Sequence, residues 1–356
     1  MFDFDSIIVY ENFRSFAAQI GLDLKRSLIA MYNYKVLSHD MALNKFEVNE
    51  PKSVPENHKD YKYIDLIKNS GLINFLCNSD IPTLMSVYLK SKIFAEGPKL
   101  FSLSTEKCEA LENVPLNLSC DNYEQPFPVM IAEFSSDYST NRLAQYDVPD
   151  MTWISDNKKR THHRPVFAVM YYSKEDKALV LSIAMDSRSD MTLILKTSDE
   201  LTLEEVFDQF ACKTLGSFVL NEEEMILSRK IYRTMCNLSM LCCDYGYNEI
   251  KDPVREKLLK KNNTKHQELN EINLLTRPMQ YELNQNVTLF QKKDIKLQEC
   301  GETGRTLKPH WRRGHWRIQA YGEGKLLRKR IFIHAVFVNP MYFGGDFSDI
   351  TTNYNL

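Results

Sequence analysis

The residues best suited to chemistry in this sequence gather near its C-terminal end. Between positions 304 and 330 the chain carries nine Lys and Arg residues and a single acid, Glu323. Guanidinium groups are planar and permanently charged and can donate paired hydrogen bonds to phosphate, while Trp and His rings offer surfaces on which bases stack. We therefore expect this segment to contact nucleic acid or a complex that contains nucleic acid, such as the ribosome. The residues expected to make the contacts are Lys308, Trp311, Arg312, Arg313, His315, Trp316, Arg317, Arg328, Lys329 and Arg330.

The same segment has the pattern of a β-hairpin. Residues 321–325, Tyr-Gly-Glu-Gly-Lys, supply flexible positions for a tight reversal between two arms. Side chains alternate along an extended arm. One face of the first arm then carries Trp311, Arg313, His315, Arg317 and Gln319, and the other carries Arg312, Gly314, Trp316 and Ile318. In the second arm, Ile331, Ile333, Ala335 and Phe337 alternate with Arg330, Phe332, His334 and Val336, which predicts one buried, anchoring face.

Other interpretations of the segment remain open. The arginines could solvate an exposed sheet edge while a tryptophan fills the core. His310 and His315, with His334 opposite, could act as metal ligands or as acid and base groups of an RNA-cleaving nuclease, although no carboxylate cluster accompanies them in the segment. The basic surface would also suit a DNA-binding plasmid or phage maintenance factor.

Residues 307–340 resemble the C-terminal signature of a plasmid- and phage-encoded family that includes a type V anti-CRISPR protein. The shared pattern comprises Arg312-Arg313-Gly314-His315-Trp316, the turn glycines Gly322 and Gly324, and Val336-Phe337-Val338-Asn339. Residues 99–118 and 126–134 are similar to the family's middle region. The chain departs from the pattern at His334-Ala335, where relatives tend to carry a Pro-containing pair, and at Phe332, a place often held by Trp.

The resemblance implies a counter-defence protein that recognises a CRISPR effector nuclease during translation and causes loss of its messenger RNA. The expected partners are the nascent effector polypeptide, its messenger RNA or the ribosome, with a host ribonuclease as a further candidate. The resemblance does not reveal whether the protein itself cuts RNA. We expect an adaptor rather than an enzyme, with no catalytic residues, cofactor or metal of its own.

The composition sets the broad class. The 356 residues are 43% hydrophobic, and 45 Lys and Arg balance 47 Asp and Glu, so any basic surface must be local. Asp3 and Asp5 stand where a secretory signal would carry basic residues, and no apolar run is long enough to cross a membrane. The eight cysteines form no CxxC pair. We expect a cytoplasmic protein of a bacterial host, with reduced thiols and no membrane contact.

The hydrophobic pattern predicts an α+β fold. Residues 1–97 form the helical N-terminal region, with helices at 13–31, at 59–76 and from Asp80, whose carboxylate should cap the first turn, to the residue before Gly97. Residues 98–243 form the α+β core, a mainly antiparallel sheet with packed helices. Residues 173–177 are expected to join two antiparallel strands, and Thr202 and Glu205 have the spacing of a reciprocal helix cap. A helical apolar stripe follows at Leu227, Ile231, Met235, Leu238 and Leu241. Residues 244–296 are expected to be a polar connector that could include a short charged helix. Residues 297–356 contain the basic hairpin.

A second basic cluster occupies residues 158–164, Lys-Lys-Arg-Thr-His-His-Arg, with Trp153 close by. It could extend the nucleic-acid surface, and a solvated loop is the alternative. The adjacent His162 and His163 point in different directions on a regular backbone, so they do not make a metal site without a third ligand.

Overall fold

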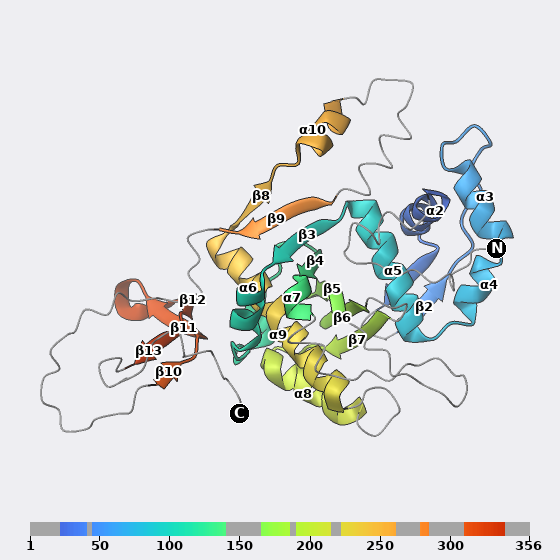
Figure 1. The fold of residues 1–356 in the computed structure, drawn as a ribbon. Coiled ribbons are helices and arrows are strands. Elements are labelled where there is room, and N and C mark those ends of the chain that lie inside the picture. The colour runs from blue at the N-terminus through green and yellow to red at the C-terminus, as the bar shows by residue number, and fades with distance from the viewer. Residues whose placement is uncertain are drawn as a thin grey trace, which may run out of the picture.

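The computed structural model shows a mixed sheet with helices on both of its faces and a β-hairpin at one side (Figure 1). It describes residues 22–40, 45–139, 165–185, 190–214, 222–260, 278–284 and 310–338. The architecture confirms the predicted α+β class with its mainly antiparallel sheet. Among the described residues, no helix is long and apolar enough to cross a membrane.

The described residues of the N-terminal part form four helices and a short hairpin. The helices are α2 (Leu22–Asn33), α3 (Tyr61–Asn69), α4 (Leu72–Cys77) and α5 (Ile81–Glu96), and the hairpin strands are β1 (Leu37–Asp40) and β2 (Lys45–Val48). The helix predicted over 59–76 is divided at Gly71, whose φ of 78° is left-handed and ends a helix. Asp80 caps α5 as predicted, because its carboxylate accepts a 2.9 Å hydrogen bond from the Thr83 amide. The β1–β2 hairpin was not predicted.

The central sheet has the strand order β7-β6-β5-β4-β3-β9-β8. Its strands are β3 (Lys99–Leu103), β4 (Val129–Phe134), β5 (Pro165–Ser173), β6 (Ala178–Met185), β7 (Asp190–Lys196), β8 (Tyr247–Ile250) and β9 (Met279–Leu283). Neighbours are antiparallel except that β3 runs parallel to both β4 and β9. The predicted hairpin joins β5 to β6 and pairs Ser173 with Ala178.

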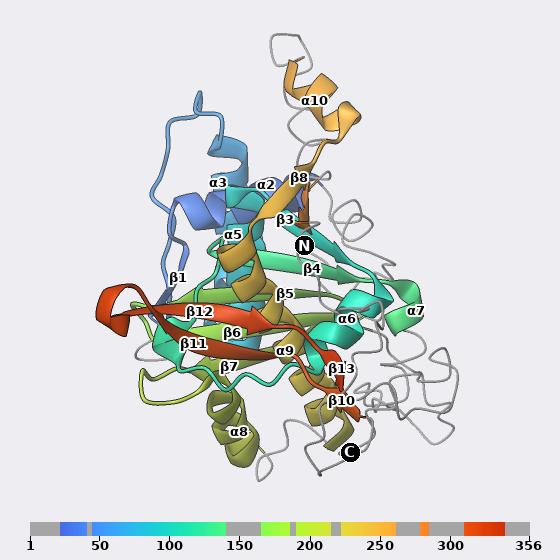
Figure 2. The ribbon, with the colours of Figure 1, turned by 90° about the vertical axis from the view of Figure 1, so that its left-hand side faces the viewer.

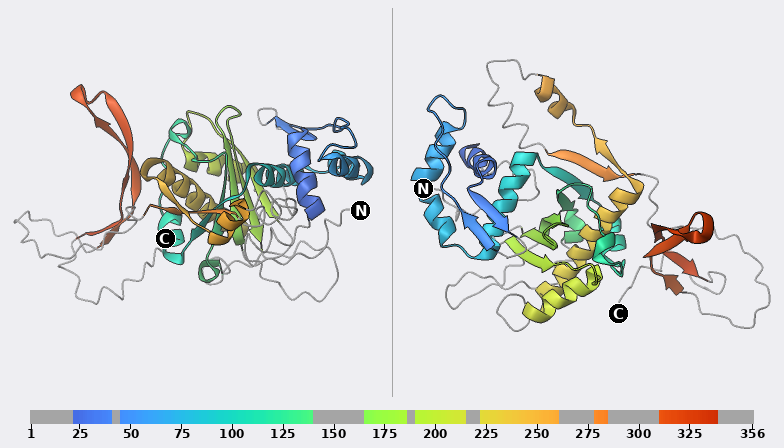
Figure 3. Two further views of the ribbon diagram at one scale, coloured as in Figure 1. Left: turned by 90° about the horizontal axis from the view of Figure 1, so that it is seen from above. Right: turned by 180° about the vertical axis from the view of Figure 1, so that it is seen from behind.

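Two hydrophobic cores lie on opposite faces of this sheet. One contains α6 (Thr105–Glu112), α7 (Ser136–Tyr138), α8 (Leu203–Thr214) and α9 (Glu222–Tyr245), and the other contains the N-terminal helices. Alternate residues of one strand serve the two cores, so Met130 packs towards α9 and Ile131 towards α5. Figure 3 shows the sheet between these helical layers. The N-terminal region therefore shares its core with the sheet.

Two predicted features of the α8–α9 layer are confirmed. Thr202 and Glu205 cap α8 reciprocally, with the Thr202 amide donating to Glu205 at 2.7 Å and the Glu205 amide donating to the Thr202 hydroxyl at 3.2 Å. The apolar stripe of α9 is fully buried. It consists of Leu227, Ile231, Met235, Leu238 and Leu241.

The described residues within 244–296, the predicted polar connector, include two strands and a helix. Strands β8 and β9 flank α10 (Pro253–Lys260) and extend the sheet beyond β3. Tyr281 and Leu283 of β9 are buried, while Gln280 and Glu282, which alternate with them, are only partly buried. A strand of five residues with this alternation carries too little apolar character to stand out in a polar sequence. The short charged helix considered as an alternative is α10, which has no buried residue.

The C-terminal hairpin has two paired sections. Its inner section pairs β10 (His310–Arg312) with β13 (Val336–Val338), and its outer section pairs β11 (His315–Tyr321) with β12 (Leu327–Ile333). The short helical turn η3 (Glu323–Lys325) reverses the chain where the Gly-rich sequence predicts it. Gly322 and Gly324 have φ values of 77° and 63°, which glycine adopts without strain.

Candidate functional site

The C-terminal hairpin, residues 310–338, lies beside α9 and reaches beyond it. Figure 2 shows β11 and β12 crossing the side of the molecule, and Figure 3 shows their far end standing away from the helices. Residues paired across the two strands share a face, so the pairs Trp316–Phe332 and Ile318–Arg330 lie on one side. The pairs His315–Ile333, Arg317–Ile331, Gln319–Lys329 and Tyr321–Leu327 lie on the other side. The hairpin thus has an inner face towards α9 and an outer face.

Trp316 anchors the inner face. Its side chain is buried, and its indole N–H donates a 2.7 Å hydrogen bond to the side-chain oxygen of Asn237 in α9. The Trp316 ring centroid lies 5.1 Å from that of Phe332, which is also buried. The expectation that Trp316 contacts a partner therefore needs correction, because its donor and its ring are both used within the protein.

Arg330 is the second anchor. Its Nε and Nη2 donate to the two carboxylate oxygens of Asp244 at 2.7 and 2.9 Å, and its Nη1 donates to the backbone carbonyl of Asn122. The guanidinium also lies 5.5 Å from the Trp316 ring centroid, within cation–π range. Only 8% of the Arg330 side chain is exposed, so its expected role in binding a partner is replaced by a structural one.

Gly314 allows the chain to pass between the two paired sections. It is buried, and a Cβ built there would lie 3.1 Å from Cζ of Phe332 and 3.3 Å from the carbonyl oxygen of Ile333. Any larger residue would push against that ring and against backbone. Gly314 and Trp316 thus account in structural terms for part of the Arg-Arg-Gly-His-Trp pattern.

Six basic residues of the hairpin are exposed to solvent. They are Arg312, Arg313, Arg317, Lys325, Arg328 and Lys329. Two of them have their geometry supported by the hairpin itself. Arg317 donates a 2.6 Å hydrogen bond to the side-chain oxygen of Gln319, and Arg328 donates a 2.6 Å bond to the Lys325 carbonyl. The exposed cations are therefore carried on a structure that is fixed to the core.

Of the two candidate catalytic histidines, the structure describes the side chain of His315 but not that of His310. His315 is half-buried, and its Nδ1 lies 3.4 Å from the carbonyl oxygen of Arg313. His310 and Trp311 have their backbones in β10, but their side chains lie outside the described part of the protein, as does Lys308. Within the described residues, no group of three or more His, Cys, Asp and Glu side chains could hold a metal ion. The second basic cluster, 158–164, lies outside the described residues.

A buried acid lies under α9, apart from the hairpin. Glu112 accepts a hydrogen bond from the Tyr138 hydroxyl, and the Lys230 ammonium lies 3.7 Å from its other oxygen. Burial raises the pKa of Glu112 above its ordinary value, while Tyr138 and Lys230 oppose that rise. These contacts join α6, α7 and α9, so the cluster is a polar link between packed helices.

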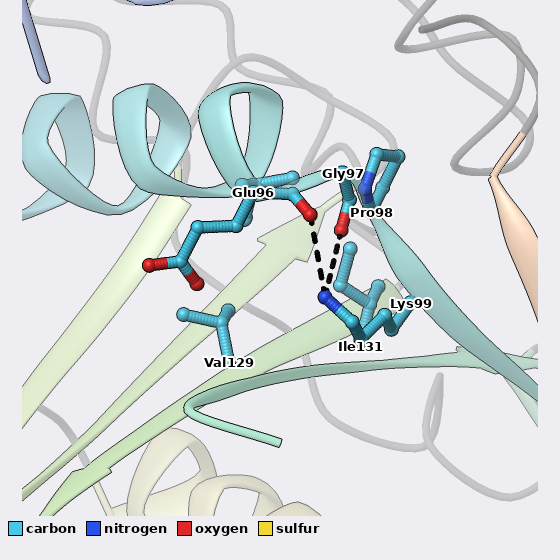
Figure 4. A pocket seen from close by; sticks show the side chains of 7 residues that line it. Glu96, Gly97, Pro98, Lys99, Val129 and Ile131 are labelled. Carbon is cyan, nitrogen blue, oxygen red and sulfur yellow. Dashed lines mark hydrogen bonds between the residues drawn. The ribbon is translucent and has the colours of Figure 1, made fainter. Parts of the chain in front are cut away.

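A small pocket lies at the end of α5, and the polar side chains that line it contact the protein itself (Figure 4). Its lining includes Glu96, Lys99, Val129 and Ile131. The Lys99 ammonium donates to the backbone carbonyls of Glu96 and Gly97, both at 3.3 Å, and so satisfies the C-terminal end of the helix. The cation of this pocket therefore serves as a helix cap.

Comparison with known proteins gives the family. Residues 101–340 match the model of the anti-CRISPR type V subtype A2 family, described as AcrVA2-like, and this range is well over half of the chain. The chain belongs to this family. The part of this AcrVA2-like protein that matches includes the central sheet from Phe101 of β3 onward, the hairpin and its anchors, whereas α2 to α5 precede it.

Solved structures similar to this chain include the crystal structure of AcrVA2, with 13% sequence identity and a TM-score of 0.35, over 77% of this chain and 86% of that one. No curated protein matches the sequence significantly.

Proposed function

We propose that this anti-CRISPR family member recognises a type V effector nuclease while it is being translated and causes loss of its messenger RNA. Membership in the type V subtype A2 family supports a role against this class of CRISPR system. The observation that carries the proposed mode of action is the row of exposed cations on an anchored hairpin. Arg312, Arg313 and Arg317 contribute the first-arm part of this row.

The charge of the hairpin suits a surface rich in RNA. The chain as a whole is close to neutral, yet its described hairpin carries seven Lys and Arg residues and one acid, Glu323. A local cluster of this kind attracts phosphate through release of counterions, without requiring a particular base sequence. The bonds from Trp316 to Asn237 and from Arg330 to Asp244 hold the cluster in one orientation on the core. Translating ribosomes and messenger RNA are the targets that such a surface supports best.

The proposed role is that of an adaptor. The exposed cations bind and orient a partner, while Nδ1 of His315 lies 3.4 Å from the backbone carbonyl oxygen of Arg313. In this proposal the loss of the transcript requires a ribonuclease of the host.

Co-expression with a type V effector tests the function. Effector transcript is measured with an intact start codon and with the start codon removed, and we expect it to fall only when the message is translated. The variant Arg312→Glu/Arg313→Glu should lose most of the effect, because reversing two exposed charges opposes an anionic surface. The matched control Lys257→Glu/Lys260→Glu reverses two exposed charges of α10 and should retain it.

Two outcomes would oppose the proposal. An equal fall of transcript with and without the start codon would exclude recognition during translation. Degradation of labelled RNA by the purified protein, abolished in His315→Ala, would replace the adaptor by the nuclease.

A further inference from the structure

The turn of the C-terminal hairpin exposes large apolar side chains to an unusual degree. Leu326 is 84% exposed, more than any other large hydrophobic residue of the described chain, and Leu327 is 54% exposed. Tyr321 of β11 is 46% exposed. Isolated exposed apolar residues are common, but a cluster on a projecting element marks a contact surface. We call Tyr321, Leu326 and Leu327 the hairpin tip.

The hairpin tip is a built structure. Tyr321 pairs with Leu327 across the strands, so their side chains lie on one face next to the turn. The Leu327 side chain packs over Gly322, where its Cδ1 would lie 3.2 Å from a Cβ. The positive φ values of Gly322, Gly324 and Lys325 fix the path of the reversal. The chain therefore holds the apolar side chains in solvent by a specific turn.

Positive charge surrounds the hairpin tip. Arg317 and Lys329 lie on the same face as Tyr321 and Leu327, and Arg328 and Lys325 flank the leucines. Glu323 is the acid of this part of the hairpin. A partner that covers the tip must satisfy aliphatic side chains at its centre and cations at its edge. This is the usual anatomy of a protein–protein contact, with an apolar centre and a polar rim.

We propose that the hairpin tip docks an acidic polypeptide segment that carries aliphatic side chains of its own. The two leucines favour protein over RNA, because aliphatic side chains offer no plane for base stacking and gain most from apolar partners. The cations select an acidic segment by charge complementarity. This inference deepens the proposed function and rests on it in one respect, since the segment would then belong to the translated effector.

Fluorescence anisotropy with defined probes tests the hairpin tip on the full-length protein. The probes are a labelled peptide of alternating Glu and Leu, a matched peptide of alternating Lys and Leu, and a single-stranded RNA of mixed sequence. The peptides span about ten residues, close to the length of a strand that the hairpin can contact. We expect the Glu–Leu peptide to bind more tightly than the Lys–Leu peptide.

Two variants and one control locate the binding. Leu326→Ser/Leu327→Ser should weaken the Glu–Leu peptide about tenfold, or ~1.4 kcal/mol, and leave RNA binding unchanged. Arg317→Glu/Lys329→Glu should weaken the Glu–Leu peptide as well. The control Val254→Ser/Leu259→Ser removes two exposed apolar side chains of α10 and should bind the peptide as the wild type does.

The outcomes separate this inference from the proposed function. Failure of the wild type to prefer the Glu–Leu peptide, or equal binding by the leucine variant, overturns the docking site. Loss of RNA affinity alone in the leucine variant assigns the tip to RNA and overturns it too. Neither result depends on the transcript measurement, so translation-dependent loss of effector transcript can stand when the docking site falls. Tip-dependent peptide binding can likewise stand when effector transcript does not change.

Discussion

The indole N–H of Trp316 donates a 2.7 Å hydrogen bond to the side-chain oxygen of Asn237, near the middle of the long helix α9. Asn237 is itself fully buried, and its amide donates to the backbone carbonyls of Leu111 and Val114 at 2.9 and 3.1 Å. One side chain thus joins the hairpin, α9 and the end of α6. A buried polar network with every member satisfied specifies a single arrangement of the elements it joins.

The variant Trp316→Phe should destabilise the protein while leaving the exposed hairpin unchanged. It keeps an aromatic ring beside Phe332 but removes the donor, so the buried oxygen of Asn237 loses its partner. The expected loss is about 1–3 kcal/mol in the free energy of unfolding, measured by chemical denaturation. Gln319→Ala, on the exposed face of the same strand, should change it by no more than about 0.5 kcal/mol. Equal effects of the two variants would contradict the anchoring role.

Arg330 and Asp244 should behave as one unit in a double-mutant cycle. Both carboxylate oxygens of Asp244 accept hydrogen bonds from the guanidinium, and either single change to Ala leaves a covered charge without its main partner. We expect each single variant to cost about 3 kcal/mol and the double variant less than the sum. Thermal unfolding of the four proteins measures this coupling energy.

A coupling energy of zero would mean that Arg330 does not depend on Asp244. Lys329→Ala is the matched control, since Lys329 precedes Arg330 in β12 and is exposed. It should leave the free energy of unfolding nearly unchanged.

Local patterns explain which parts of the structure the sequence could predict. The turn glycines, the alternation of the hairpin arms, the Asp80 cap and the apolar stripe of α9 depend on neighbouring residues, and each was predicted in place. The predicted placement of Arg317 and Trp316 on different faces of the first arm also holds in β11 and β12, although Trp316 was expected to contact a partner.

Long-range partners explain what the sequence could not predict. Trp316 and Asn237 are 79 residues apart, and Arg330 and Asp244 are 86 residues apart. An arginine in a basic run gives no sign of whether a distant carboxylate neutralises it. Nothing in the sequence likewise distinguishes Asn237 from the other polar residues of its helix. The site residues missed for this reason are the anchors Asn237 and Asp244.

The stability of the protein should carry a pH dependence from Glu112. Its folded-state pKa is raised above the ordinary 4.5 because burial penalises the charged form, with Tyr138, Lys230, Glu109 and Cys108 as neighbours. A raised folded-state pKa stabilises the fold below the unfolded pKa, and this contribution is lost as pH rises through the folded value. Glu112→Gln keeps an acceptor for Tyr138 and does not titrate.

Denaturation of wild type and Glu112→Gln across the acid range measures this contribution. The Gln variant should gain stability relative to the wild type as pH rises above 4.5, and the difference should level off once Glu112 is ionised in the folded protein. A difference that stays constant, or that changes in the opposite direction, would contradict the raised pKa.

The variant Gly314→Ala should loosen the outer section of the hairpin. The new methyl would meet the ring of Phe332 at 3.1 Å and the backbone at Ile333 and Ala335 at 3.3 and 3.4 Å, so the strand must shift away. Overpacking of this kind costs about 1–3 kcal/mol. Because Phe332 also packs on Trp316, the shift should raise the amide hydrogen exchange of β11 and β12 more than that of β5 and β6.

The double variant Gly314→Ala/Phe332→Leu tests the cause of that loosening. A leucine is shorter than the phenylalanine ring and removes the closest contact of the new methyl, whereas the backbone contacts at Ile333 and Ala335 remain. If the ring is the main obstacle, the added cost of Gly314→Ala should be smaller in the Phe332→Leu background than in the wild type, as chemical denaturation of the four proteins would measure. An equal cost in both backgrounds would place the obstacle in the backbone of β12 and β13.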